Sequence, residues 1–166
     1  PRVSELPNAS LQELSDALTI LYQDDALVVV NKPSGLLVHR GWDNDSIVAM
    51  TVVRDPVGKH VYPVHRLDRP TSGALVFVLN QDAARALSQS FENREIKKRY
   101  LALVRGVCPA EGCIDYPIHN QPRRKGPRVP AITDFVRLYD WDRFSLVEAR
   151  PRTGRLHQIR RHLRHI

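Results

Sequence analysis

The sequence contains no long hydrophobic run and few cysteines. Its apolar runs, such as residues 26–30 and 74–79, are strand-sized, far short of the roughly 18 residues that a membrane-spanning helix needs. Residues 1–20 carry acidic side chains and no continuous apolar core, so we expect no secretory signal. Two cysteines, Cys108 and Cys113, cannot build a disulfide framework in a chain of 166 residues. These features predict a cytoplasmic protein.

Signatures of common cofactor sites are also absent. Residues 32–35 do not fit a phosphate-binding loop, and no Gly-x-Gly-x-x-Gly occurs, so no nucleotide cofactor is expected. The histidines near the C-terminus have no i,i+4 pair, no carboxylate nearby and several arginine neighbours, which disfavours zinc. Cys108 and Cys113 are at most half of a metal site. We expect no metal and no other cofactor.

Positive charge is concentrated at the C-terminal end of the chain. The net charge is +7, yet residues 1–120 carry one more acid than base, and residues 121–166 carry 12 basic and 4 acidic side chains. All of these bases except Lys125 are arginines, whose forked donors suit phosphate. We interpret this segment as binding nucleic acid; a solvated tail or buried ion pairs would give the same composition.

The apolar periodicity predicts an α+β fold with a mixed, mainly antiparallel sheet flanked by helices. Helices are predicted over residues 10–18, 46–53 and 82–94, and strands over 19–23, 26–31, 61–64, 74–79, 98–104, 132–138 and 144–149. The Pro- and Gly-rich residues 107–130 predict a long loop with one strand near Ile114. We expect residues 1–18 to be an N-terminal extension with a short helix.

A further helix is predicted after the turn at residues 153–154. Arg155 would lie in its first turn, with Gln158 and His162 near the same face and the apolar residues 156, 159 and 163 turned inward. Such an arginine-rich helix start can present N–H and guanidinium groups to an anion.

Residues 65–73 gather reactive side chains in a short loop between two apolar strands. Asp68, flanked by Arg66 and Arg69, should stay ionised and could act as a nucleophile. A structural alternative is that Asp68 forms a turn before Pro70 or pairs with an arginine. Tyr100 can be a packed strand aromatic or, near a carboxylate and arginines, can exchange a proton with a substrate.

Four segments resemble the RluA-type family of RNA pseudouridine synthases: DDALVVVNKPSGLLVHR, HRLDRPTSGALVF, KKRYLALVRG and RTGRLHQIRRHL. The resemblance covers residues 19–166 and is closest to the tRNA pseudouridine-65 synthase branch. It implies the pseudouridine synthase fold and the isomerisation of a specific, flipped-out uridine without metal or cofactor. The substrate that this branch implies is tRNA (position 65 type). The same reaction on ribosomal RNA and a non-catalytic RNA-binding domain are the alternatives.

The resemblance also assigns roles by position. Asp68 matches the catalytic aspartate that attacks the ribose or the base, Tyr100 the active-site tyrosine, and Arg155 the basic residue that orients the aspartate. Arg66 matches the arginine that enters the RNA where the uridine has left the stack. The residues expected to contact RNA are Arg66, Arg69, Arg123, Arg124, Lys125, Arg160 and Arg161.

The resemblance bears on domain organisation as well. Residues 19–166 would form the catalytic domain, incomplete at its C-terminal end because the family's fold continues beyond the RRHL motif. We expect a monomer whose partner is RNA, with no membrane association and no separate N-terminal RNA-binding module.

Overall fold

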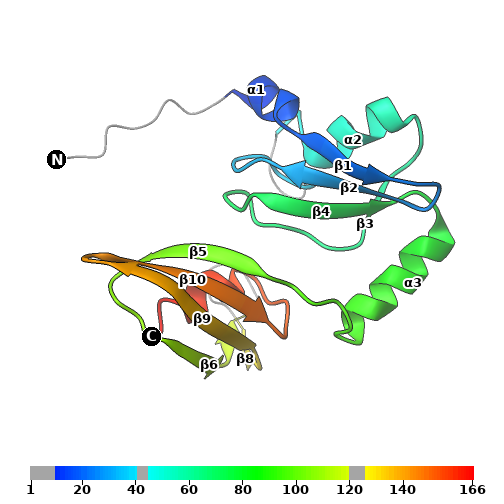
Figure 1. Cartoon of the computed structure of the whole chain (residues 1–166). Helices are drawn as coiled ribbons and strands as arrows, with labels where there is room; N and C mark the ends of the chain where they lie inside the picture. Colours follow the sequence, from blue (N-terminus) through cyan, green and yellow to red (C-terminus); the bar gives the residue numbers. More distant parts are fainter. Residues whose placement is uncertain (1–9, 41–44, 120–125) are drawn as a thin grey trace. The chain divides into compact units, whose positions relative to one another are not determined.

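A computed structural model describes residues 10–40, 45–119 and 126–166 (Figure 1). The chain divides into two compact units, Pro1–Asn93 and Arg94–Ile166. Every strand pairing among the described residues is antiparallel, which confirms the predicted α+β class. None of the described helices is long and apolar enough to span a membrane.

The first unit is a four-stranded sheet with three helices. The strands lie in the order β1-β2-β4-β3, with bounds β1 Thr19–Gln23, β2 Leu27–Lys32, β3 Tyr62–Pro63 and β4 Gly73–Val78. The helices are α1 Leu11–Asp16, α2 Ala49–Val57 and α3 Gln81–Glu92. Strand β2 alternates between buried and more exposed positions, so Val28, Val30 and Lys32 lie on one face.

Helix α1 begins where the sequence predicts. The Ser10 hydroxyl accepts a hydrogen bond from the Glu13 backbone N–H at 3.2 Å, and the Glu13 carboxylate accepts one from the Ser10 N–H at 2.7 Å. This reciprocal pair satisfies two N–H groups that a helix start leaves without partners. Asn80 caps α3 in a similar way, accepting from the Ala83 N–H at 2.8 Å.

Helix α2 differs from its predicted range of 46–53. It starts at Ala49 and continues to Val57, with Pro56 inside its last turn. Proline removes one hydrogen bond, to the carbonyl four residues earlier, but its fixed φ is compatible with a helix. The helix ends instead at Gly58, which has a φ of 67° and donates its N–H to the Arg54 carbonyl.

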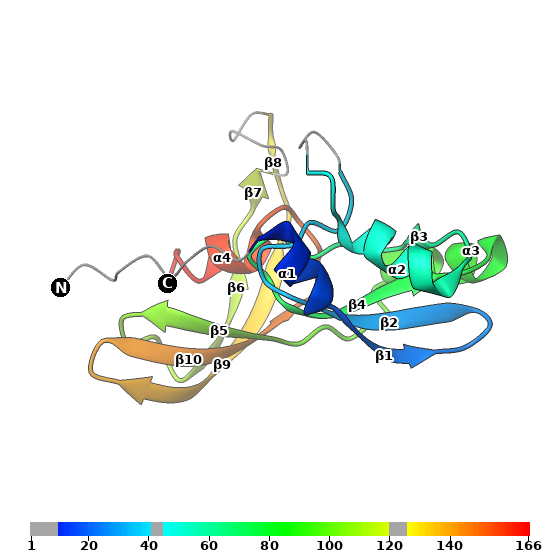
Figure 2. The ribbon, with the colours of Figure 1, turned by 90° about the horizontal axis from the view of Figure 1, so that it is seen from above.

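The second unit is built on the sheet β5-β10-β9-β6, with a separate hairpin of β7 and β8. The bounds are β5 Tyr100–Arg105, β6 Glu111–Asp115, β7 Ile118–His119, β8 Arg128–Val129, β9 Ile132–Trp141, β10 Phe144–Pro151 and α4 Gln158–His162. Figure 2 shows β5 running along the long hairpin of β9 and β10. The predicted strand near Ile114 is confirmed as β6, whereas β7 and β8 were not predicted.

The core of the second unit lies on one face of its sheet. Cys108, Ile114, Phe135 and Val147 form a buried cluster, against which Leu163 packs from the end of α4. Residues of β5 alternate accordingly: Leu101 and Leu103 are exposed on the opposite face, while Tyr100, Ala102 and Val104 are half-buried.

Candidate active site

Asp68 lies on the loop that connects β3 to β4 in the first unit. Leu67 is only 6% exposed and anchors the loop in the core, while Asp68 is half-buried and Arg66 is exposed. The Asp68 carbonyl accepts a hydrogen bond from the Thr71 N–H at 2.9 Å. The loop therefore carries a half-buried carboxylate and an exposed arginine on a backbone held by this bond.

A second loop, at residues 33–36, is bonded to the Asp68 loop. The Gly35 N–H donates to the Arg69 carbonyl at 2.7 Å, and the Ser34 hydroxyl donates to the Pro70 carbonyl at 2.9 Å. Gly35 has a φ of +95°, a conformation that side chains disfavour. These contacts join two segments that lie more than 30 residues apart in the sequence.

Lys32 lies fully buried beneath these two loops. Its ammonium donates to three carbonyl oxygens, those of Pro33 (2.8 Å), Leu36 (2.7 Å) and Arg69 (3.3 Å). Burial lowers the pKa of Lys32 to about 8, and the negative charge of Asp68 opposes this shift. Lys32 is thus a buried cation that holds the Asp68 loop and attracts its carboxylate.

Arg69, predicted to contact RNA, is bound within the protein. Its guanidinium forms an ion pair with Asp45, and the Arg69 side chain is 45% exposed. The RNA contact of Arg69 stays a prediction, and so does that of Arg66, whose side chain is exposed.

Tyr100 is the first residue of β5 and pairs with Ala149 of β10. It is half-buried and alternates with the exposed Leu101, so it lies on the sheet face that carries the core of the second unit. Just before it, the Lys98 ammonium donates to the Thr153 carbonyl at 3.3 Å, and burial lowers the pKa of Lys98. Lys98 therefore connects the Tyr100 strand to the loop that carries Arg155.

The prediction that Arg155 lies in the first turn of a helix is wrong. Helix α4 starts only at Gln158, after His157 with a positive φ of 52°. The Gln158 side-chain oxygen accepts hydrogen bonds from the Arg155 N–H at 3.0 Å and the Thr153 hydroxyl at 2.8 Å, which hold this segment as a turn. The half-buried Arg155 donates from Nε to the Pro130 carbonyl at 3.2 Å.

The prediction that only apolar residues of this helix turn inward is incomplete: Leu163 packs on the core, but the most buried side chains are polar. Gln158 and His162 are buried, whereas residues 156, 159 and 163 are half-buried. Gln158 Nε2 donates to the Thr133 hydroxyl at 2.9 Å, and that hydroxyl lies 2.9 Å from His162 Nδ1. His162 Nε2 lies 3.0 Å from the Tyr116 carbonyl, which can only accept, so the proton is on Nε2 and Nδ1 accepts from Thr133.

This arrangement predicts a stability that depends on pH. Burial lowers the pKa of His162 from its ordinary 6.5, and the nearby His165 acts in the same direction. As the pH falls below 6.5, the unfolded chain takes up a proton on His162 before the folded chain does, so the free energy of unfolding falls. Urea denaturation at a series of pH values should show this loss in the wild type and in His157→Gln, an exposed control, but less of it in His162→Gln. Equal pH slopes in all three proteins would contradict the assignment.

Some of the arginines form ion pairs within the protein, which was one of the alternatives to nucleic-acid binding that the composition allowed. Glu148, which is buried, binds both Arg99 and Arg150, and Asp134 binds Arg152 through two hydrogen bonds of 2.6 and 2.7 Å. These arginines belong to the strands and their ends, not to α4.

The arginines of α4 are placed differently. Arg160 is exposed, and the half-buried Arg161 donates to the His119 carbonyl. The remaining predicted RNA contacts, Arg123, Arg124 and Lys125, lie outside the described residues.

The structure thus places Asp68 in the first unit and Tyr100 and Arg155 in the second. Lys32 was missed by sequence reasoning, which assigned residues 32–35 only to a turn. The signal was available in the alternation of β2, because Lys32 follows Val28 and Val30 on the buried face.

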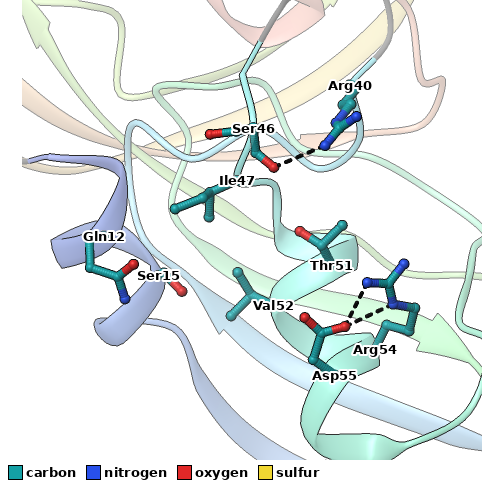
Figure 3. Close-up of a pocket in the computed structure, with 9 residues that line it drawn as sticks. All are labelled: Gln12, Ser15, Arg40, Ser46, Ile47, Thr51, Val52, Arg54 and Asp55. Atoms are coloured by element: carbon teal, nitrogen blue, oxygen red, sulfur yellow. Dashed lines mark hydrogen bonds and ion pairs between the residues drawn. The ribbon is translucent and has the colours of Figure 1, made fainter.

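A separate pocket of about 460 Å³ lies between α1, α2 and the segment preceding α2 (Figure 3). It is lined by Gln12, Ser15, Arg40, Ser46, Ile47, Thr51, Val52, Arg54 and Asp55. Its two arginines are engaged, Arg54 with Asp55 and Arg40 with the Ser46 carbonyl at 3.2 Å. The pocket contains neither Asp68 nor another predicted site residue.

Comparisons with known proteins point to one family. Residues 26–165 match the family model described as RNA pseudouridylate synthase. A tRNA pseudouridine synthase C of Pasteurella multocida is 45% identical over 90% of this chain and 70% of its own length. The same enzyme of Salmonella typhimurium is 46% identical, and the match covers 65% of its length.

Solved structures agree with these sequence matches. Human RNA Pseudouridylate Synthase Domain Containing 4 aligns with a TM-score of 0.75 and 29% identity over 92% of this chain. Human RNA Pseudouridylate Synthase Domain Containing 1 aligns with a TM-score of 0.74. The chain spans 65% and 64% of the lengths of these two structures.

Proposed function

The chain belongs to the RNA pseudouridylate synthase family, and we propose that it converts a uridine of tRNA into pseudouridine. The proposal is carried by the Asp68 loop, which presents a carboxylate on a backbone held by Lys32. The names of the bacterial relatives, tRNA pseudouridine synthase C, support tRNA as the substrate. The similarity of the motifs to the branch that acts at position 65 supports that position.

The proposed reaction is an isomerisation in which no atom is gained or lost overall. The bond between N1 of uracil and C1′ of ribose breaks, and C5 of the rotated base bonds to C1′. C5 loses its proton to a base, and N1 gains a proton. The uridine must leave the base stack for this to happen, because its reacting atoms are otherwise enclosed by neighbouring nucleotides.

Three residues would perform these steps. Asp68 is the proposed nucleophile, Arg155 the cation that orients it, and Tyr100 the residue that packs on the base and accepts the C5 proton. These roles follow the family resemblance, residue by residue. The hydrogen bond of Lys98 to Thr153 supports them, since it keeps the strand of Tyr100 beside the loop of Arg155.

The RNA backbone would be bound mainly by arginines. The exposed Arg66 would enter the space that the flipped uridine leaves, and Arg160 and Arg161 would bind phosphates. Arg69, Arg123, Arg124 and Lys125 complete the proposed contacts. We further propose that the protein acts as a monomer in the cytoplasm, where a reducing environment suits its two free cysteines.

Mapping pseudouridine in cells with and without the gene tests this function. We expect one pseudouridine to disappear from tRNA, at position 65, while the ribosomal RNA sites persist. Restoring the gene should restore the site, and restoring the Asp68→Asn gene should not. Loss of a ribosomal RNA site instead would show that ribosomal RNA is the substrate. Unchanged maps of both RNAs would contradict catalysis.

A further inference from the structure

Strand β3 ends early and leaves one N–H group of β4 to be satisfied by a side chain. Tyr62 pairs with Val78 and Pro63 with Phe77, so continued pairing would place residue 64 opposite Val76. Backbone N–H groups two residues apart on a strand point to the same side. The Leu79 N–H donates to the Ala26 carbonyl next to β2, so the N–H groups of Val78 and Val76 point to the opposite edge, which the chain leaves after Pro63.

The imidazole of His65 takes the place of the missing strand. Its Nε2 lies 3.0 Å from the Val76 nitrogen. A backbone N–H can only donate, so Nε2 is the acceptor and the ring carries its proton on Nδ1. The ring also stacks on Phe91 of α3, with centroids 5.0 Å apart and planes at 25°.

These contacts fix the start of the loop that carries Asp68. The part of the loop that follows Asp68 is held by the hydrogen bonds that the Arg69 and Pro70 carbonyls accept from residues 32–35. Asp68 thus lies three residues after one anchor and directly before the other. With the His65 anchor removed, the segment that leads to Asp68 would keep only the buried Leu67 and the bonds that follow Asp68.

We propose that His65 is a positioning residue for the isomerisation: its imidazole replaces a β-ladder acceptor and so holds the Asp68 carboxylate at the place where it must attack. This role rests on the function proposed above. A misplacement of about 1 Å at a reacting group can cost on the order of 10²-fold in rate, so a small shift of the loop would be visible in kcat.

Two substitutions separate the acceptor from the ring. His65→Phe keeps an aromatic ring against Phe91 but removes the acceptor, and His65→Gln keeps an acceptor near the position of Nε2 but removes the ring. With tRNA from cells lacking the gene, we expect kcat of His65→Phe to fall by about 10²-fold while RNA affinity changes little. His65→Gln should recover most of the rate.

A stability control is needed, because an unsatisfied N–H also destabilises the fold. Val53→Ala opens a cavity at a buried residue of α2, which is not part of the Asp68 loop, and provides a destabilised first unit for comparison. If this variant loses kcat as His65→Phe does at a comparable melting temperature, His65 acts only on stability and the inference is wrong. Wild-type kcat in His65→Phe would overturn it as well.

Amide hydrogen exchange at Val76 gives a readout that does not depend on activity. We expect fast exchange in His65→Phe and protection in the wild type and His65→Gln. Unchanged protection in His65→Phe would refute the inference even in an active enzyme. If wild-type protein modifies no RNA while the Val76 pattern holds, the proposed function fails and the structural anchor remains.

Discussion

Replacing Asp68 with asparagine is expected to lower pseudouridine formation by roughly 10⁴-fold or more. The amide has nearly the shape of the carboxylate but is not a nucleophile, so the substitution removes the chemistry and leaves the loop in place. RNA binding should persist, because the proposed RNA contacts are arginines and one lysine and do not include Asp68. The rate is measured by quantifying pseudouridine in single turnovers, and affinity by filter binding.

Asp55→Asn is the matched control for this experiment. It removes the same charge from an exposed carboxylate of the first unit that pairs with Arg54, outside the Asp68 loop. We expect it to retain wild-type activity. Retained isomerisation by Asp68→Asn would reject Asp68 as the nucleophile. If substitutions of Asp68 are silent and only those of Arg160 and Arg161 matter, the chain is a non-catalytic RNA-binding domain.

Replacing Lys32 with methionine is expected to destabilise the first unit by about 2–4 kcal/mol. Methionine is similar in size, so the cavity is small, but three carbonyls lose their shared donor. The free energy of unfolding is measured by urea denaturation. Lys59→Met, which changes an exposed lysine of the same unit, should have almost no effect.

The wild type and Lys32→Met should also differ in how the free energy of unfolding depends on pH. Burial lowers the pKa of Lys32 from 10.5 to about 8, so below pH 8 the lysine is protonated in both the folded and the unfolded chain. Between pH 8 and 10.5 the unfolded chain holds a proton that the folded chain has released, and the free energy of unfolding therefore rises with pH in this window. Lys32→Met should lack this rise. A wild-type profile in the variant would contradict the burial of the charge.

Local patterns predicted those elements that depend on local interactions. The reciprocal bonds of Ser10 and Glu13 involve four consecutive residues, and the apolar run that forms β4 needs no distant partner to be recognised. Helix α4 was misplaced because its start depends on Gln158, whose amide binds the distant Thr133. Apolar periodicity does not register a polar side chain that is buried against such a partner.

The residues of the candidate site likewise fall into those that the sequence predicts and those that only the structure reveals. The composition of residues 65–73 was enough to single out Asp68 as a displayed carboxylate, and the roles of Tyr100 and Arg155 came from the family resemblance. The supports of the loop could not be predicted, because Lys32 and His65 act on Arg69 and Val76 through contacts between separate strands and loops. Only the three-dimensional register of β2, β3 and β4 brings these groups together.

The bonding of residues 32–35 to the Asp68 loop restricts how this enzyme can be recombined with its relatives. A donor loop that differs in length or backbone path would not present its carbonyls to Lys32, Ser34 and Gly35 of the recipient. Chimeras made to alter substrate choice should therefore transplant both segments as one module. Insertions are better tolerated elsewhere on the surface, such as at the Asp142–Arg143 turn between β9 and β10.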